Sequence, residues 1–298
     1  MCGIVGIFLK DPALEPMLGA MLTDMLITMT DRGPDSAGIA IYVRPEAGHS
    51  KLTVQSANPA MDFKGLEDDL ATEIGAKVTS EIKDTHIVLD VPHDLLDQAR
   101  AAVTRIRPSV KVMSAGDSIE IFKEVGLPRD VARRFGVAKM AGTHGIGHTR
   151  MATESAVTTM GAHPFSTGAD QCLVHNGSLS NHNSVRRDLI RAGMSFETEN
   201  DTEVAAAFLT HKMQDGDNLG TAMAATLTDL DGFFTFVVGT KNGFGVVRDP
   251  IACKPAVMAE TDQYVAFGSE YRAMVNLPGI DKARIWEPEP ATVYFWER

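Results

Sequence analysis

Residues 1–8, MCGIVGIF, form the most informative stretch of this chain. The run is apolar and β-branched and is interrupted by Gly3 and Gly6, which is typical of a buried strand. Removal of the initiator methionine would leave Cys2 with a thiol and a free α-amine on one residue. Their unperturbed pKa values are roughly 8.5 and 7.7–8.0, so near neutral pH the amine can serve as the base for the thiol. Cys2 is therefore a candidate nucleophile, whereas its plain alternative is a small buried apolar residue.

The composition is that of an ordinary globular protein. The chain has 298 residues, of which 44% are hydrophobic and 22% charged, and its length permits one or two domains. A net charge of −11 and the lack of any Lys/Arg run argue against a nucleic-acid partner.

Cysteine usage and the N-terminal sequence indicate the compartment. The three cysteines lack metal-ligand spacing, and we expect Cys172 and Cys253, which lie in apolar stretches, to be core residues. An odd cysteine count without a signal peptide points to a reducing environment. No stretch approaches ~18 uninterrupted apolar residues, so we expect a cytoplasmic protein without a membrane partner. The histidines show no HxxxH pattern, and no metal is expected.

Alternating elements predict two stacked, largely antiparallel sheets flanked by helices. The expected helices outside the middle of the chain are 14–29, 129–135, 184–192, 202–213 and 222–227. The expected strands there are 2–8, 39–43, 52–55, 119–126, 143–149, 171–175, 233–239, 244–247, 257–259, 264–267 and 292–296.

The stretch from about 58 to 116 has a different character. A helix at 62–74, a strand at 83–91, a helix at 92–106 and a strand at 110–114 predict a compact α/β unit. We interpret residues 58–116 as a small inserted subdomain and a candidate docking or regulatory element.

Further segments accompany the N-terminal run in a specific order: RGPDSAG (32–38), GIGHTRMAT (145–153), HPF (163–165), HNGSLSNH (175–182), ENDTEV (199–204) and DPIACKP (249–255). Together they resemble the glutaminase domain of class II (N-terminal nucleophile) glutamine amidotransferases over residues 1–57 and about 117–275, with a weaker match to the end. The resemblance implies an α+β fold, the Ntn-hydrolase αββα sandwich of antiparallel sheets, made from residues 1–57 and 117–298.

The resemblance also implies which residues recognise the substrate, glutamine. Arg150 matches an arginine that binds the α-carboxylate, a task for which the guanidinium fork is suited. Thr153 matches a threonine near the substrate backbone. Asp201 matches an aspartate that binds the α-ammonium, and its plain alternative is a helix N-cap. Arg150 and Asp201 together would select a zwitterionic amino acid.

Catalytic and supporting residues follow from the same resemblance. The Asn176 side chain and the Gly177 N–H match the two donors of an oxyanion hole, and we expect the strand before them to end at Asn-Gly. We interpret Arg32 as a residue that holds the Cys2 region, and His163 as structural. Relatives often carry histidine before the arginine, where this chain has Asp31, which leaves the local charge open.

The ammonia acceptor is expected on another polypeptide, because the chain stops at Arg298 without a nucleotide, sugar-phosphate or flavin motif. The sequence most resembles the stand-alone glutaminase-like subunit of a split glutamate synthase, of the N-methylglutamate synthase type of methylamine metabolism. That resemblance implies synthase subunits as partners, with FMN and iron–sulfur clusters on those partners and no cofactor in this chain.

Three alternatives stay open at this point. The chain could be a non-catalytic glutamine-sensing or scaffold subunit that uses the same pocket. It could be a terminal-cysteine hydrolase of another amide. It could also be an interaction protein in which the 58–116 insertion does the work.

Overall fold

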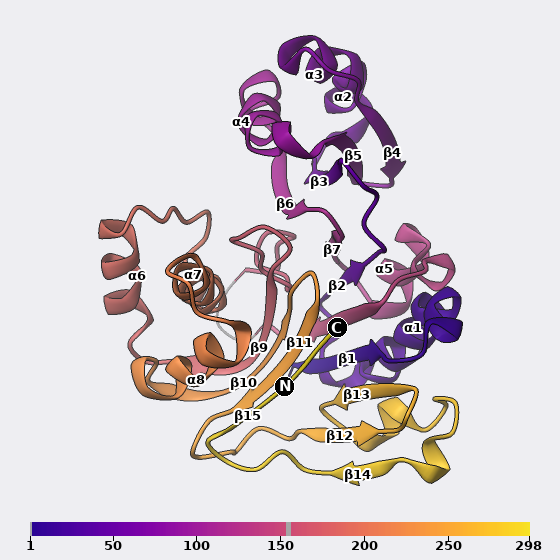
Figure 1. The fold of residues 1–298 in the computed structure, drawn as a ribbon, viewed down its shortest axis with the longest axis vertical. Helices are drawn as coiled ribbons and strands as arrows, with labels where there is room; N and C mark the ends of the chain where they lie inside the picture. The colour runs from indigo at the N-terminus through magenta and orange to yellow at the C-terminus, as the bar shows by residue number, and fades with distance from the viewer. Residues whose placement is uncertain (1, 153–155) are drawn as a thin grey trace.

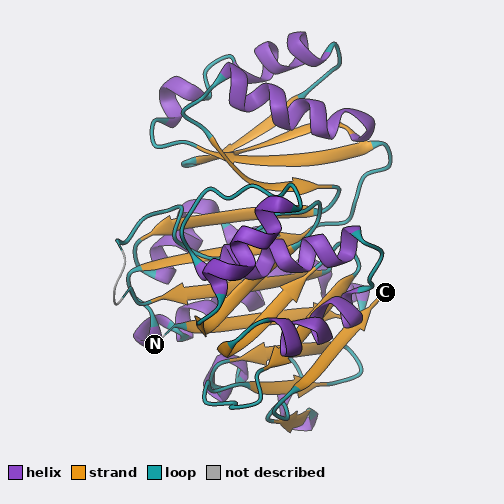
Figure 2. Ribbon diagram, turned by 90° about the vertical axis from the view of Figure 1, so that its left-hand side faces the viewer, coloured by secondary structure: helices purple, strands orange, loops and turns teal. Residues whose placement is uncertain are grey.

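Two antiparallel sheets stack face to face at the centre of the molecule, with helices on both outer faces (Figures 1 and 2). The computed structural model describes residues 2–152 and 156–298. The larger sheet has seven strands in the order β14 (Arg284–Trp286), β12 (Val257–Glu260), β13 (Tyr264–Gly268), β1 (Gly3–Leu9), β8 (His144–Arg150), β2 (Ser36–Tyr42) and β7 (Ile119–Val125). The smaller sheet has the order β15 (Thr292–Glu297), β11 (Gly243–Arg248), β10 (Gly232–Gly239) and β9 (Cys172–Leu179).

Helices cover the outer face of each sheet. On the larger sheet these are α1 (Leu18–Thr28) and α5 (Pro128–Phe135). On the smaller sheet they are α6 (His182–Arg191), α7 (Asp201–Gln214) and α8 (Leu219–Asp229). The predicted αββα sandwich of antiparallel sheets is confirmed.

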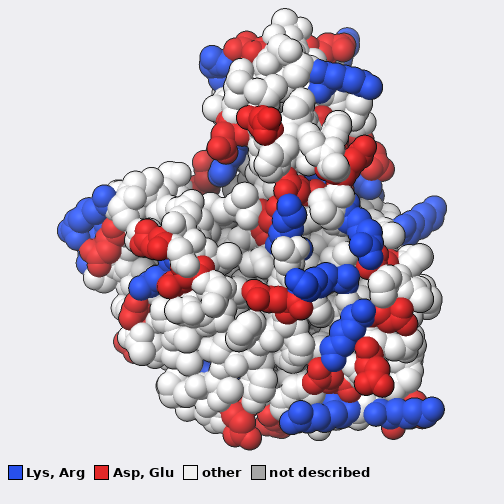
Figure 3. All heavy atoms as spheres, in the orientation of Figure 1, with Lys and Arg blue, Asp and Glu red and all other residues white. Residues whose placement is uncertain are grey.

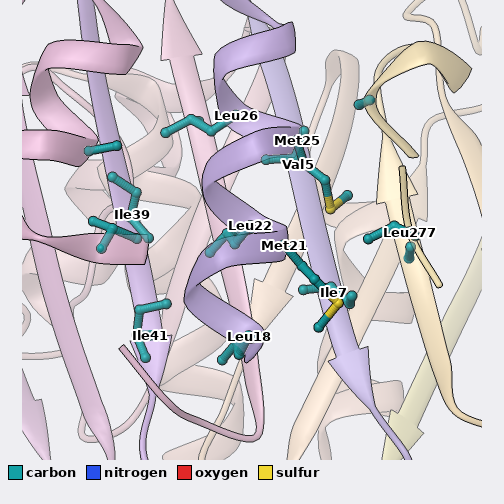
Figure 4. Packing of buried hydrophobic residues seen from close by; sticks show 14 of the residues in the cluster. Val5, Ile7, Leu18, Met21, Leu22, Met25, Leu26, Ile39, Ile41 and Leu277 are labelled. Atoms are coloured by element: carbon teal, nitrogen blue, oxygen red, sulfur yellow. The ribbon is translucent and has the colours of Figure 1, made fainter. Parts of the chain in front are cut away.

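The first helix differs in one detail from the sequence-based expectation. The apolar period predicted one helix over 14–29, whereas Pro12–Met17 is a 3₁₀-helix and α1 begins at Leu18. Pro16 lacks a backbone N–H and so removes the α-helical hydrogen bond that such a helix would need there. In Figure 4, Met25 and Met21 of α1 lie beside Val5 and Ile7 of β1, all inside one buried cluster.

Side-chain alternation along β1 fills two separate cores. Val5, Ile7 and Leu9 face α1, whereas Ile4 and Phe8 face the other sheet. Because both faces are covered, every residue of β1 is buried. This explains why the strand reads as a continuous apolar run rather than an alternating one.

A third sheet belongs to a separate layer, which we call the small unit and define as residues 49–116. Its strand order is β4 (Thr79–Lys83), β5 (His86–Pro92), β3 (His49–Gln55) and β6 (Lys111–Gly116). The helices α2 (Pro59–Asp62), α3 (Leu66–Ile74) and α4 (Leu96–Ile106) cover its outer side, and the sheet faces the rest of the molecule (Figure 2).

The small unit begins earlier than the boundary drawn at residue 58. Leu52 and Val54 of β3 pack into the core of the small unit, so this strand lies in its sheet. The expected list of strands lacked β4, whose residues are exposed or half-buried and give no apolar signal. The division into two domains stays a prediction.

The two remaining cysteines have different surroundings. Cys172 is buried, and Tyr42 Oη donates to its Sγ across 3.4 Å. Cys253 is exposed, so its predicted core position was wrong. It follows β11 in a turn in which Asp249 accepts backbone N–H groups, and apolar neighbours in sequence do not bury a residue that lies outside a strand.

In the described part of the chain, the surface charges and the hydropathy of the helices show no feature that marks a special environment. Basic and acidic side chains are interspersed on the face drawn in Figure 3. Within residues 2–152 and 156–298, no helix is both long and apolar enough to cross a bilayer.

A prediction concerns Asp170, a buried carboxylate that ties the small unit to the sandwich. It accepts the backbone N–H groups of Asp117, Ser118 and Ile119 at the entrance to β7, at 2.8–3.1 Å. Asp170→Asn keeps the size and the left-handed backbone preference (φ 52°) but places an amide donor against these donors. We expect a loss of about 1–3 kcal/mol in the free energy of unfolding, measured with urea. Asp262→Ala, at an exposed carboxylate, is the control, and equal midpoints for the two variants would contradict the role of Asp170.

Candidate active site

The candidate site lies where β1, β8 and β9 bring three side chains to one end of the layer between the sheets. Gly3 pairs with Thr149 at the end of the β1–β8 ladder, and Cys2 and Arg150 are the next residues along the two segments. Alternation turns Cys2, Arg150 and Asn176 to the side occupied by Ile4, Ile146 and Val174, which are all inter-sheet core residues.

Two side chains hold the backbone of Cys2. Arg32 Nε donates to the Cys2 carbonyl at 3.0 Å, and Asn176 Nδ2 donates to the same oxygen at 3.2 Å. Arg32 Nη1 also donates to Glu270 Oε1 at 2.8 Å, which fixes the guanidinium. Cys2 is a free cysteine and the residue is half-buried, so its thiol has no disulfide partner while its backbone is held. Asp31 lies 3.5 Å from Arg272 Nη1 and does not contact Cys2 through any described hydrogen bond.

Arg150 ends β8 as a buried side chain. Its Nη1 donates to the Ala156 carbonyl at 3.4 Å. Its own carbonyl accepts the Asp35 N–H at 3.1 Å, so the RGPDSAG loop contacts the strand end. Thr153, predicted to lie near the substrate backbone, is outside the described residues.

The expectation that the strand ends at Asn-Gly was wrong. β9 continues through Asn176 and Gly177 to Leu179, and Gly177 lies opposite Phe234 in the ladder with β10. Gly177 has φ 153°, and a Cβ there would lie 1.9 Å from the Phe233 carbonyl oxygen. The glycine thus lets two strands approach closely where any larger residue would part them.

Asp201 contacts β9 on both sides of Asn176 and Gly177. Its Oδ2 accepts the Leu179 N–H at 2.9 Å, and its Oδ1 lies 3.7 Å from His175 Nδ1. Burial opposes ionisation, but His175 and the Leu179 N–H outweigh it and lower the pKa of Asp201 to about 2. Asp201 therefore carries a negative charge at neutral pH.

The N-cap of α7 is Asn200, so the N-cap alternative for Asp201 was wrong. Asn200 Oδ1 accepts the Thr202 N–H at 2.9 Å. Asp201 is the first helical residue, where a carboxylate is also favoured by the helix dipole.

A row of buried imidazoles lies behind these residues. The rings of His148 and His163 stack with centroids 4.1 Å apart. Thr202 Oγ1 lies 2.8 Å from His163 Nε2 and 3.1 Å from His175 Nδ1 and joins the two rings. Burial lowers the pKa of His148 to about 3 and that of His163 well below its usual range, so both rings are neutral. Sequence reasoning missed Thr202, although its place beside Asp201 in ENDTEV was a usable signal.

Among residues 2–152 and 156–298, no three His, Cys, Asp or Glu side chains are grouped so that they could hold a metal ion.

The αββα sandwich, with β1 at the centre of its larger sheet and Cys2 at the strand's free end, defines the Ntn-hydrolase fold. Among solved structures, glutamine phosphoribosylpyrophosphate amidotransferase from B. subtilis matches with a TM-score of 0.60 and 19% identity, over 99% of this chain and 47% of that chain. A structure described as the allosteric regulatory enzyme of purine biosynthesis matches with a TM-score of 0.62, also at 19% identity and over the same shares. At this identity the likeness concerns the fold alone.

Sequence comparison adds the family. A glutamine amidotransferase domain model matches residues 148–276. The glutamine amidotransferase-like protein GlxB of Rhizobium meliloti (strain 1021) is 69% identical over 100% of this chain and 98% of its own length. A putative glutamine amidotransferase of Methanothermobacter thermautotrophicus is 33% identical over the full length of both chains. The chain belongs to the glutamine amidotransferase family and is an enzyme of that class.

A prediction follows for the glycine in the candidate oxyanion hole. Gly177→Ala forces a Cβ against the Phe233 carbonyl, whereas a Cβ added to Gly193, which also has a positive φ of 95°, would have nothing within 4 Å. Both alanine variants add backbone strain of about 1–3 kcal/mol. We expect Gly177→Ala to lose about 1–3 kcal/mol more than Gly193→Ala in urea unfolding, because of the clash. Equal losses would mean that β9 and β10 can part without cost.

Proposed function

We propose that this chain hydrolyses free glutamine to glutamate and ammonia through a γ-glutamyl thioester on Cys2, once Met1 has been removed. The observation that carries this is the convergence at one end of the sandwich. Asn176 donates to the carbonyl of Cys2. Arg150 directly follows Thr149, which pairs with Gly3 in the β1–β8 ladder. Asp201, at the start of α7, accepts the N–H of Leu179 near Asn176 on β9.

Arg150 and Asp201 have the charges needed to recognise the two ends of an amino acid. The guanidinium would bind the α-carboxylate in a bidentate manner, and the carboxylate of Asp201 would bind the α-ammonium. The low pKa of Asp201 keeps its charge throughout the physiological range. The side-chain amide of glutamine is then the part directed to Cys2.

The chemical steps use the groups around Cys2. The α-amine takes the thiol proton, through a water molecule, and the thiolate attacks the carboxamide carbon. The oxyanion accepts hydrogen bonds from Asn176 Nδ2 and the Gly177 N–H. An amide nitrogen carries two hydrogens, so Asn176 can donate one to the Cys2 carbonyl, as observed, and the other to the oxyanion. Ammonia leaves with the transferred proton, and water then cleaves the thioester to release glutamate.

We further propose that the ammonia is delivered to a partner synthase of the N-methylglutamate synthase or glutamate synthase type, in the cytoplasm. FMN and iron–sulfur clusters would belong to the partner subunits and not to this chain. This part rests on the sequence resemblance. Co-purification from the native host, followed by identification of the bound subunits and their flavin and iron content, tests it; recovery of the chain without any synthase subunit would contradict it.

The nucleophile is tested by comparing the three cysteines. We expect Cys2→Ala to lower ammonia release from glutamine by on the order of 10³-fold or more. Cys253→Ala, at an exposed thiol, and Cys172→Ala, in the core, should retain turnover. Intact-mass measurement should show a protein without Met1 and, after rapid acid quenching, a γ-glutamyl adduct.

Retained turnover in Cys2→Ala would overturn the proposed mechanism. Glutamine binding by the wild-type protein without ammonia release or an adduct would instead favour a glutamine-sensing subunit.

Substrate recognition is tested at Arg150. Arg150→Lys keeps the positive charge but loses the planar fork, so we expect kcat/KM for glutamine to fall about 10–100-fold. Hydrolysis of an analogue that lacks the α-carboxylate should change little. An equal fall for both substrates would assign Arg150 a structural role, and unchanged use of glutamine would favour a hydrolase of other amides.

A further inference from the structure

One stretch of backbone, residues 156–165, lies against the guanidinium of Arg150. The Ala156 carbonyl accepts from Arg150 Nη1, and a Cβ on Gly161 would lie 3.5 Å from the same nitrogen. Whatever holds this stretch in place therefore also bears on the position of the guanidinium.

Lys123 binds the stretch from inside the sandwich. Its Nζ donates to the carbonyls of Met160, Ala162 and Pro164 at 3.3, 2.8 and 3.2 Å. It also lies 4.4 Å from the centroid of the Phe165 ring. These bonds use all three donors of the ammonium, which is itself buried. A charged side chain in such a place is costly unless it is fully bonded, so this arrangement specifies the path of the stretch.

The larger sheet has a glycine, Gly38, where the stretch crosses it. Gly38 on β2, next to β7, faces the same layer, and a Cβ there would lie 2.0 Å from the His163 carbonyl oxygen. The stretch thus passes directly over a strand that has no side chain at this point.

Glu124, the next residue of β7, binds the same stretch from the other side of the strand. Its Oε1 accepts from Thr159 Oγ1 at 2.5 Å. Its Oε2 accepts from Thr85 Oγ1 at 3.0 Å, and Thr85 belongs to the turn between β4 and β5 of the small unit. An ion pair of Arg134 with Asp84, at 2.6 Å, holds that turn against α5. One carboxylate therefore connects the small unit to the stretch that contacts Arg150.

We propose that Lys123 and Glu124 are positioning residues for Arg150, and that the small unit, through Thr85, sets the affinity of the site for glutamine. The proposal rests on the proposed function, in which Arg150 binds the α-carboxylate. It gives the insertion a task inside this chain: a partner that moves the β4–β5 turn would change glutamine binding without touching the site.

The first experiment removes the hydrogen bond between Thr85 of the small unit and Glu124. Thr85→Val deletes one hydroxyl at the surface of the small unit and should raise KM for glutamine about 2–10-fold, with kcat unchanged. Thr72→Val is the matched control, because its hydroxyl donates to the Asp68 carbonyl of its own helix. Thr159→Val should have a similar effect to Thr85→Val. Because both hydroxyls bind Glu124, the double variant should raise KM by a factor different from the product of the two.

The second experiment measures the stretch itself and needs no substrate. Hydrogen exchange of a peptide covering residues 156–165 should become faster in Thr85→Val and faster still in Lys123→Met, with the exchange of β1 unchanged. Lys139→Met, at an exposed lysine, is the control. Unchanged exchange and unchanged KM in Thr85→Val would overturn the proposal, even if Lys123→Met fails to fold. If wild-type protein neither binds nor hydrolyses glutamine while exchange responds as expected, the proposed function fails and the link from the small unit to this stretch stands.

A pH dependence provides an independent readout. Burial lowers the pKa of Lys123 to about 7, so the ammonium is present below that pH and is lost above it. The groups that act on it electrostatically are Glu203 on α7, which favours the charged form, His163 in the stretch and His86 on β5. Burial lowers the pKa of both histidines, so they stay neutral across this range.

We therefore expect the interaction of Lys123 with the backbone carbonyls of residues 160–164 to weaken as pH rises. In a Cys2→Ala background, which removes catalysis, the calorimetric Kd for glutamine should rise between pH 6 and pH 8. The rise should be absent in Cys2→Ala/Lys123→Met. An equal pH dependence in the two proteins would assign the titration to another group and contradict the positioning role of the Lys123 ammonium.

Discussion

The site depends on the pairing of β1 with β8 on one side and β13 on the other. The ladder with β8 reaches Gly3 at the start of β1, whereas the ladder with β13 begins at Val5, and Ile4 exchanges hydrogen bonds with Ser269. The fixed end needs few further contacts, and Arg32 and Asn176 supply them through one carbonyl oxygen. The Cys2 thiol is thus left free while two side chains hold the backbone that carries it.

Burial controls the charges around this end of the sandwich. His148 and His163 are neutral because burial disfavours their charged form, whereas Asp201 stays ionised because hydrogen-bond donors outweigh its burial. In the proposed function, Arg150 and Asp201 supply one charge of each sign for the two ends of free glutamine. The neutral imidazoles provide polar packing behind Asp201 without adding a competing positive charge.

The sequence predicted the sandwich well because its strands are buried on both faces and its helices have clear apolar periods. The prediction was wrong where local pattern and tertiary contact disagree. Asn176-Gly177 has the pattern of a turn, but β9 continues through it. The glycine is needed there because β10 approaches β9 closely, and this contact cannot be seen in the sequence. Cys253 lies in an apolar stretch but outside any strand, and the solvated β4 carried no pattern at all. The placements predicted for the site residues came from motif resemblance, whereas Lys123 and Glu124 belong to no quoted motif and became candidates only through their contacts.

The position of the small unit in the chain explains why its contacts converge on one stretch of backbone. The chain leaves the larger sheet after β2 and returns into β7, its neighbour in the sheet, so both connections lie at the same edge. Asp170 binds the returning chain at Asp117–Ile119, and Lys123 and Glu124 bind residues 159–164 a few positions earlier. Residues 156–170 are thus hydrogen-bonded at several points to β7 and to the chain segment that leads into it. A displacement of the small unit must either break these bonds or move the backbone that Arg150 contacts. Because these hydrogen bonds involve buried charges, breaking them would cost more free energy than moving the backbone. A displacement of the small unit would therefore move the backbone that contacts Arg150.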